Sequence, residues 1–438
     1  MNYFSSSSAM SRPRILSGAL TSGSEMDDDN SAGRRERMYR KWFDSSYANG
    51  ENCPVVDVSI PWLYESHSVW VLSIVSVVIW YAANRAGPFG SAQEALLAAV
   101  PYAVSIFLAV GLFAFPSGPF IRPHPIVWKL VFGVSLLYLM VLIALLVPSP
   151  SQMRQMLNFI DPKVGIPFEL PLYAEDCSLT WQNLKENTDV FVLAHFFGWL
   201  IKALFFRHRI LLWVFSITWE LLELALIYMV PNFAECWWDQ WVMDVLICNG
   251  LGIEVGLWIC KRLEFRKYQW TGVLESRTLL AKVKRIALQF TPAEWNKVEW
   301  ESSKTFTRYL QVQGILWLSI LMDLNAFMLK LFLFIPTTHW WNVSRLLFVA
   351  LAAAPAYRQG YLFFVDERVK RLGTQTIVLI MISIAELALV LKAGSDFHIP
   401  EMPWVNKVGI ALYFGAYIIV SGLLLRKSRK EKYMQKNE

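Results

Sequence analysis

Groups able to bind a cation gather in one short part of this 438-residue chain. Five carboxylates lie between positions 220 and 244, with Asn232 among them: Glu220, Glu223, Glu235, Asp239 and Asp244. Oxygen donors suit a hard cation, and their number favours Ca²⁺ over Mg²⁺. We expect the metal ligands to be Glu220, Glu223, Asn232, Glu235 and Asp239. Because the carboxylates carry more charge than one dication, some are protonated, some lie outside direct coordination, or two ions bind.

The spacing of these residues predicts shared helix faces. Glu220 and Glu223 are three residues apart and lie on one face of a helix. If 232–239 is also helical, Asn232, Glu235 and Asp239 share a face as well. Carboxylates gathered in this way repel one another strongly unless a cation binds between them.

His195 is the histidine near these acidic residues. A single histidine disfavours a zinc site. Its side chain titrates near neutral pH and could act as a general base, with Asp244 orienting it. A purely structural role for either residue is an equal alternative.

The composition predicts the elements that must position these groups. The chain is 55% hydrophobic and 17% charged, with a mean hydropathy of +0.37, whereas soluble domains are roughly 25% charged. This excludes a disordered chain, a coiled coil and a basic nucleic-acid module, and we expect no nucleic-acid partner. Ten apolar runs approach the roughly 20 residues of a membrane span. They lie at about 68–84, 92–115, 126–147, 189–206, 210–230, 241–260, 311–335, 341–356, 376–392 and 405–425. The predicted fold is an all-α polytopic membrane protein of about ten transmembrane helices.

The basic residues predict the orientation. With a cytosolic N-terminus and alternating segments, 31 of the 41 Lys and Arg residues fall on the cytosolic side and four on the other. This bias follows the positive-inside rule and places both termini in the cytosol.

Three regions follow from this layout. Residues 1–60 are polar and predict a disordered cytosolic tail. Residues 61–425 form one transmembrane catalytic domain, with an amphipathic helix at about 276–290 on the cytosolic membrane surface. Residues 426–438 form a basic cytosolic tail. The five cysteines have no CxxC spacing, so the sequence allows one disulfide and requires none.

The predicted topology brings the candidate groups to one depth. The segments at 189–206 and 241–260 run inward and the segment at 210–230 runs outward, so His195, Glu220, Glu223 and Asp244 share the non-cytosolic half. The alternative, a set of water-facing residues at the membrane edge, is disfavoured by the mutual repulsion of the carboxylates. A cation beside a base at this depth suits chemistry on a phospholipid phosphate, with the base deprotonating an incoming hydroxyl.

Two other functions use the same residues differently. A cation-binding membrane transporter would need polar groups through both halves of the membrane, but the inner half of these segments is nearly bare apart from Lys202. A nucleotide-dependent phosphatidyltransferase would usually carry a D-G…A-R…G…D…D pattern, which we do not find.

Several motifs resemble the eukaryotic base-exchange phosphatidylserine synthases, from about residue 115 to about 425. The longest is PNFAECWWDQWVMDVLICNG at 231–250. The others are GPFIRPHP at 118–125, HFFGWLIKAL at 195–204, WELLE at 219–223 and KRIALQFTPAEW at 284–295.

The resemblance implies a ten-helix enzyme of the endoplasmic reticulum membrane that depends on Ca²⁺. It would exchange the choline of phosphatidylcholine or the ethanolamine of phosphatidylethanolamine for L-serine, without a nucleotide, and a homodimer is a further expectation. The family's essential histidine corresponds to His195. Its acidic cation-site residues correspond to Glu220, Glu223, Asn232, Glu235, Asp239 and Asp244.

The resemblance also implies a second lipid site. Feedback by the product, phosphatidylserine, is associated in the family with the RPHP segment, hence with Arg122 and His124. By the predicted topology this segment is cytosolic and apart from the acidic residues, so it favours a regulatory site. Ordinary head-group contact is the alternative for Arg122. The sequence does not decide between choline and ethanolamine.

Overall fold

The computed structural model describes most of the chain beyond residue 67. The described residues are 68–84, 91–120, 125–168, 174, 176–187, 190–264, 278–288, 298–300, 302, 305–398 and 400–437. The chain divides into two units, 1–45 and 46–438, and all described residues lie in the second. The predicted tail at 1–60, Arg122 and His124 lie outside the described residues.

Each of the ten predicted segments coincides with a helix among these residues. They are α2 (Ser68–Asn84), α3 (Ala92–Ala114), α4 (Pro125–Leu145), α7 (Val190–Phe206), α8 (Arg209–Leu226), η3 (Asp239–Asn249) continued by α9 (Gly250–Glu264), α11 (Phe306–Phe332), α12 (Trp340–Val365), α13 (Thr374–Ala393) and α14 (Trp404–Asn437). Shorter helices are α5 (Pro150–Ile160), α6 (Trp181–Asn187), η2 (Pro231–Phe233) and α10 (Leu279–Leu288). The described part of the chain contains no β-strand, so the all-α prediction is confirmed there.

Five stretches are long and apolar enough to cross a membrane: Ile126–Leu145, Asp239–Glu264, Phe306–Phe332, Thr374–Ala393 and Trp404–Lys427. Leu97–Leu112 and Val192–Phe206 are shorter apolar helices. These findings support a multi-pass membrane protein. The count of ten spans and the orientation of the termini remain predictions. The amphipathic helix predicted at 276–290 coincides with α10, where Leu279 and Leu280 are exposed beside Lys282.

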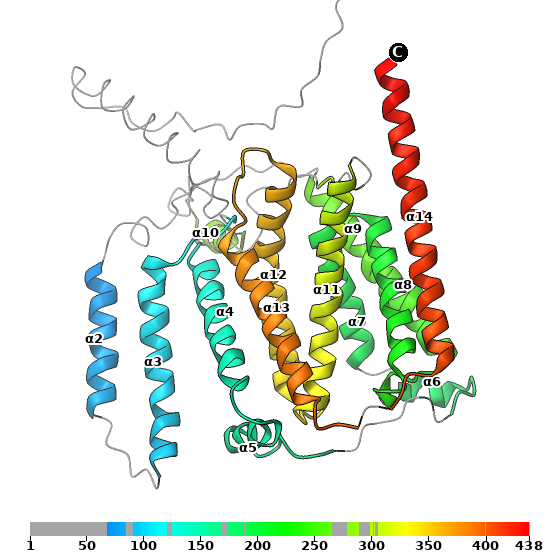
Figure 1. Cartoon of the computed structure of the whole chain (residues 1–438). Helices are drawn as coiled ribbons and strands as arrows, with labels where there is room; N and C mark the ends of the chain where they lie inside the picture. Colours follow the sequence, from blue (N-terminus) through cyan, green and yellow to red (C-terminus); the bar gives the residue numbers. More distant parts are fainter. Residues whose placement is uncertain are drawn as a thin grey trace, which may run out of the picture. The chain divides into compact units, whose positions relative to one another are not determined.

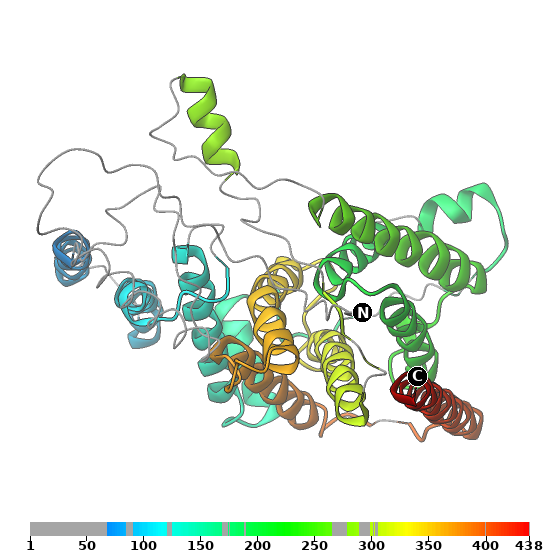
Figure 2. The same ribbon diagram turned by 90° about the horizontal axis from the view of Figure 1, so that it is seen from above.

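The long helices run side by side along a common direction (Figure 1). α2 packs on α3, α3 on α4, and α4 on α13, which also contacts α11 and α12. α7 packs on α9 and η3, while α8 contacts α11 and α14. Figure 2 shows these helices end-on, with α14 beside α8. The candidate site lies among α7, α8 and η3.

Aromatic and aliphatic side chains bury the interface around α7 and α8. The core there includes Trp199, Phe206, Leu212 and Phe215. Trp300, which is buried, donates its indole N–H to the Phe206 carbonyl at 2.7 Å. Satisfying this polar group inside an apolar core avoids the cost of a buried orphan donor and fixes the end of α7.

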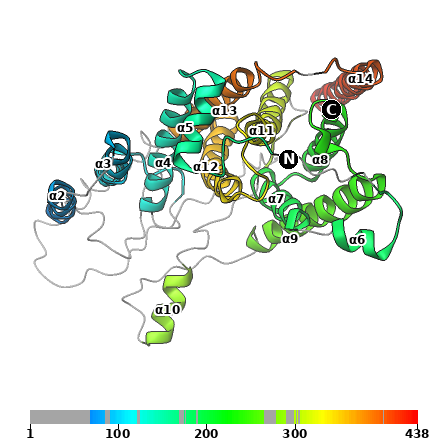
Figure 3. The same ribbon diagram turned by 90° about the horizontal axis from the view of Figure 1, so that it is seen from below.

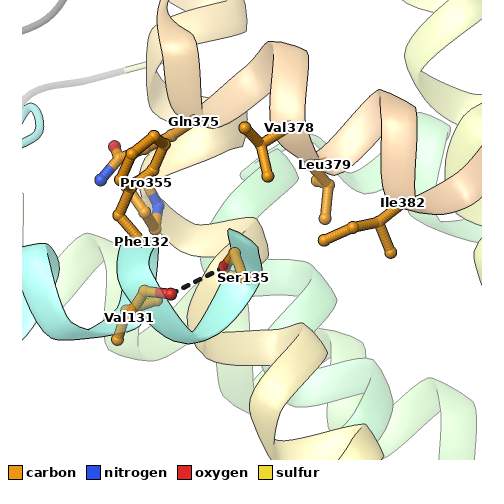
Figure 4. A pocket seen from close by; sticks show the side chains of 9 residues that line it. Val131, Phe132, Ser135, Pro355, Gln375, Val378, Leu379 and Ile382 are labelled. Carbon is orange, nitrogen blue, oxygen red and sulfur yellow. Dashed lines mark hydrogen bonds between the residues drawn. The ribbon is translucent and has the colours of Figure 1, made fainter. Parts of the chain in front are cut away.

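A small cavity lies elsewhere, between α4, α12 and α13 (Figure 4). Val131 and Phe132 line it from α4, Pro355 from α12, and Gln375 and Ile382 from α13. Its volume of about 10 Å³ suits one water molecule. None of its lining residues belongs to the predicted catalytic or metal site.

Candidate active site

Three helices bring the predicted groups to one place. α7 carries His195, α8 carries Glu220 and Glu223, and η3 carries Asp239 and Asp244. A two-residue link joins α7 to α8 and forces the pair antiparallel. The beginning of α7, the end of α8 and the beginning of η3 therefore share one end of these helices, on the side of α6 (Figures 1 and 3).

The link between α7 and α8 can be short because its two residues, Arg207 and His208, end one helix and begin the next. Arg207 adopts a positive φ of 51° and its backbone N–H donates to the Ala203 carbonyl, so it ends α7 as a left-handed cap. His208 then caps α8, since its side chain accepts from the Leu211 N–H. This geometry fixes the register of α7 against α8.

His195 faces Asp244 across the α7–η3 interface. The Nδ1 atom of His195 lies 3.7 Å from Oδ1 of Asp244. The distance exceeds that of a hydrogen bond, but the carboxylate stands where it can hold the ring and stabilise a protonated imidazole. The pairing leaves Nε2 as the ring nitrogen for proton transfer. About a quarter of the His195 side chain is exposed, so a substrate can reach it.

Glu220 and Glu223 lie buried on the inner face of α8. The Asn249 side chain donates to Oε1 of Glu220 at 3.0 Å and to the Ser216 hydroxyl at 3.0 Å. Gln240 donates to the Glu220 backbone carbonyl. Oε2 of Glu220 has no hydrogen-bond partner among the described residues. A buried carboxylate oxygen without a donor is costly, so this atom is available to a cation.

Glu235 belongs to an irregular stretch rather than a helix. The 3-10 turn η2 ends at Phe233, and the next helical residue is Trp237. The condition that 232–239 is helical is therefore not met, and the shared face of Asn232, Glu235 and Asp239 does not follow from it. Phe233, Cys236 and Trp238 are each buried, and that spacing does not follow one helix face. Tertiary anchoring of these three side chains overrides the local helical pattern.

The surroundings of Glu235 are acidic and largely dry. Burial and, next to it, the negative charge of Asp244 together raise the pKa of the Glu235 carboxyl to about 9. Its Oε2 atom also has no hydrogen-bond partner among the described residues. Glu220, Glu223, Glu235 and Asp244 are all close enough to act on one another electrostatically. The predicted gathering of acidic groups is therefore present in the structure.

The first turns of the segment after Trp238 form a π-helix, which the sequence analysis missed. η3 spans Asp239–Asn249, and in a π-helix each backbone N–H bonds to the carbonyl five residues earlier. Residues five apart, such as Asp239, Asp244 and Asn249, therefore stack near one face. In an α-helix they would lie about 140° apart. The five-residue spacing of these polar groups was the feature of the sequence that could have indicated a π-helix.

Two predicted ligands are less fully described. Asn232 lies in η2, but its side chain is outside the described part of the structure. Asp239 opens η3 and acts electrostatically on Glu235. The structure thus brings His195, Asp244, Glu220, Glu223 and Glu235 together, with Asp239 beside them.

The donor set fits a hard cation in chemistry and charge. Every candidate ligand offers oxygen, two buried carboxylate oxygens lack donors, and the mutual repulsion of the acids favours a positive ion. Within the described ranges, no three His, Cys, Asp or Glu side chains already stand in a metal-binding arrangement. Binding would therefore draw the carboxylates inward onto the ion.

A disulfide lies beside these groups. Cys177 and Cys236 are bonded, and Cys236 is the neighbour of Glu235. Cys248 and Cys260 are free and buried. The bond ties the stretch before α6 to the stretch that carries Glu235, and it is the single disulfide that the sequence allowed.

Comparison with known proteins shows which family this sequence belongs to. Residues 123–394 match the family model described as phosphatidyl serine synthase. The chain is 37% identical to "Phosphatidylserine synthase" of Drosophila melanogaster over 84% of this chain and 74% of that protein. It is 37% identical to "Phosphatidylserine synthase 1" of Danio rerio over 78% of this chain and 74% of that protein.

A plant relative has a different name. The chain is 35% identical to "CDP-diacylglycerol--serine O-phosphatidyltransferase 1" of Arabidopsis thaliana, over 80% of this chain and 87% of that protein. Residues 123–394, which match the family model, contain all the candidate catalytic and metal residues. The chain therefore belongs to the phosphatidylserine synthase family and is a phospholipid head-group transferase.

Proposed function

We propose that this enzyme makes phosphatidylserine by Ca²⁺-dependent base exchange, replacing the choline or ethanolamine of a phospholipid with L-serine. The observation that carries the proposal is the placement of the His195–Asp244 pair beside the buried carboxyls of Glu220, Glu223 and Glu235. A base can deprotonate an incoming alcohol, and a hard cation beside it can stabilise charge on the phosphodiester that the alcohol attacks.

Each group has a defined task in this reaction. Nε2 of His195 takes the proton from the serine hydroxyl, whose oxygen forms the new P–O bond as the bond to the departing choline or ethanolamine breaks. The same proton then passes to the departing alcohol, so no nucleotide is consumed. Asp244 orients the ring and stabilises its protonated form. Ca²⁺ held by Glu220, Glu223, Asn232, Glu235 and Asp239 would neutralise charge on the phosphate oxygens.

The proposed location is the endoplasmic reticulum membrane, with both termini cytosolic and the active site on the lumenal side. The Cys177–Cys236 disulfide supports this sidedness, because disulfides persist in oxidising compartments. Arg122 and His124 would then belong to a cytosolic regulatory site for phosphatidylserine. A homodimer also stays part of the proposal.

A second candidate function is nucleotide-dependent transfer. It is favoured by the printed name of the Arabidopsis relative, which specifies CDP-diacylglycerol as donor. Both reactions need a base for the serine hydroxyl, so the site alone suits either. The transporter alternative finds no support among the relatives, which are named as synthases or, in Arabidopsis, as a phosphatidyltransferase.

Serine incorporation decides between these reactions. Purified protein in detergent micelles with phosphatidylcholine or phosphatidylethanolamine should attach labelled L-serine to lipid when Ca²⁺ is present. Activity should need no CDP-diacylglycerol and should vanish in His195→Ala. His398→Ala is the matched control, because His398 is an exposed histidine outside the cluster. A requirement for CDP-diacylglycerol, or activity with Ca²⁺ chelated, would overturn the proposed function.

A further inference from the structure

Lys202 forms an ion pair beside the active site that the proposed mechanism does not use. It lies on α7, seven residues and about two helical turns after His195, so both project from the same face. Its Nζ lies 2.8 Å from Oδ2 of Asp323 on α11. The ammonium also stacks over the rings of Trp199 at 4.5 Å and Phe215 at 4.9 Å.

The Lys202–Asp323 pair differs from a second ion pair of this protein, Arg345–Glu386, in which the carboxylate is almost fully hydrogen-bonded. The Glu386 carboxylate accepts three hydrogen bonds from Arg345 and one from the Tyr138 hydroxyl, and only 1% of its side chain is exposed. In contrast, 24% of Lys202 and 26% of Asp323 are exposed. The Lys202 ammonium has three donors, and one carboxylate does not use them all. The pair can therefore accept a further anionic oxygen.

The position of the ammonium relates it to the cluster of acids. Lys202 is about 10 Å further along α7 than His195, but lysine side chains in helices point back toward the N-terminus. The ammonium therefore extends toward the level of His195, and its charge acts on the Glu220 carboxyl. The ammonium thus lies within electrostatic reach of the acidic groups while it contacts the apolar rings of Trp199 and Phe215.

The remaining donors of the Lys202 ammonium suit an anion that belongs to the lipid rather than to free serine. Free serine is polar and enters the acidic end from water, whereas a phospholipid keeps its glycerol and acyl chains in the apolar layer. The anionic group next to those chains is the phosphate. An ionised residue within membrane helices is expensive, and such residues are retained for function.

We propose that Lys202 binds a phosphate oxygen of the phospholipid donor, with Asp323 holding the ammonium in position. This inference rests on the proposed function and adds a residue that positions the donor lipid. The edge-to-face pair of Trp199 and Phe215, whose ring centroids are 5.1 Å apart, limits the directions open to the lysine side chain. The phosphate thus contacts Lys202 from one side and His195 from the other.

Steady-state kinetics test this assignment. Lys202→Met should raise KM for the phospholipid at least about tenfold, with KM for serine unchanged and kcat less affected. Lys202→Arg should recover part of the lipid affinity. Lys129→Met is the matched control, since Lys129 is a half-buried lysine of α4 whose ammonium donates to the Leu112 carbonyl. An unchanged lipid KM in Lys202→Met, or a raised KM for serine instead, would overturn the inference.

A binding measurement separates this inference from the proposed function. Thermal unfolding in detergent should shift upward when phosphatidylcholine is added and not when diacylglycerol, which lacks phosphate, is added. Lys202→Met should lose that shift while Lys129→Met keeps it. If the wild-type protein shows no base exchange yet keeps the Lys202-dependent shift, the proposed function fails and the lysine assignment stands. Equal shifts in both variants would contradict the assignment.

Discussion

The Asn249 side chain donates to Oε1 of Glu220 at 3.0 Å, which joins the end of the π-helix to the acidic face of α8. Both side chains are fully buried. The other oxygen of Glu220 is buried and has no donor in the part of the chain that the structure describes, so it is available to a cation. Asn249 thus determines which oxygen of Glu220 is free.

Removing this donor should weaken cation use. Asn249→Ala leaves both Glu220 oxygens without a side-chain donor, so the carboxylate loses its fixed orientation. We expect the Ca²⁺ concentration for half-maximal activity to rise roughly tenfold. Asn406→Ala is the control, since the Asn406 side chain of α14 donates to the backbone carbonyls of Leu224 and Ala225 on α8. An unchanged Ca²⁺ response in Asn249→Ala would contradict this role.

Asp244 should matter for rate more than for binding. In Asp244→Asn the amide keeps the shape of the side chain but cannot stabilise protonated His195. We expect kcat to fall by about 10²–10⁴ with smaller changes in KM for either substrate. Initial rates at varied serine and lipid concentrations would separate the change in kcat from the changes in KM. A variant that loses lipid affinity but keeps kcat would assign Asp244 to binding instead.

Helix positions followed from the sequence because a membrane span needs a long apolar run whatever its partners are. The segment predicted at 68–84 matches α2 at both ends, and the one at 189–206 differs from α7 by one residue. The closeness of the acidic residues followed from their types and their positions in adjacent apolar segments, and the structure brings Glu220, Glu223, Glu235 and Asp244 near one another.

Tertiary contacts hid the rest of the site from sequence reasoning. The break at 234–236 depends on buried anchors and on Cys177, which is 59 residues away in the chain. Asp323 is remote in sequence from Lys202, so no local pattern pairs them. The π-helix places Asp239, Asp244 and Asn249 nearer one face than a period of 3.6 residues would.

The Arg345–Glu386 pair should govern folding rather than catalysis. Glu386→Ala leaves the buried Arg345 guanidinium without its carboxylate, which typically costs about 3–5 kcal/mol. We expect a large fall in Tm and in the yield of folded protein. The double variant Arg345→Met, Glu386→Leu removes both charges and should recover much of the loss. Full stability in Glu386→Ala would show that the pair contributes little.

Asp396 should make stability depend on acid pH. Hydrogen bonds from the Arg154 guanidinium hold the pKa of Asp396 below its usual value. A depressed carboxyl pKa stabilises the fold above the unfolded value near 4 and loses that contribution as the pH falls through the folded value. Asp396→Asn should therefore lower Tm by about 1–3 °C at pH 7, and the difference should shrink toward pH 3. A pH-independent difference would assign the effect to packing.

The proposed topology predicts opposite labelling of two exposed positions. Trp181 of α6 is 80% exposed and near the disulfide, so the proposal places it in the lumen; Val283 of α10 is 55% exposed and belongs to the cytosolic amphipathic helix. Cysteines introduced as Trp181→Cys and Val283→Cys should react with an impermeant maleimide from opposite sides of sealed microsomes. Among the described residues the free thiols, Cys248 and Cys260, are buried and give a low background, and both variants are made in a Cys53→Ser chain to remove the remaining thiol. Position 283 should react in intact vesicles and position 181 only after permeabilisation. The reverse pattern would invert the proposed orientation, and labelling of both from one side would show that the number of spans between them is even.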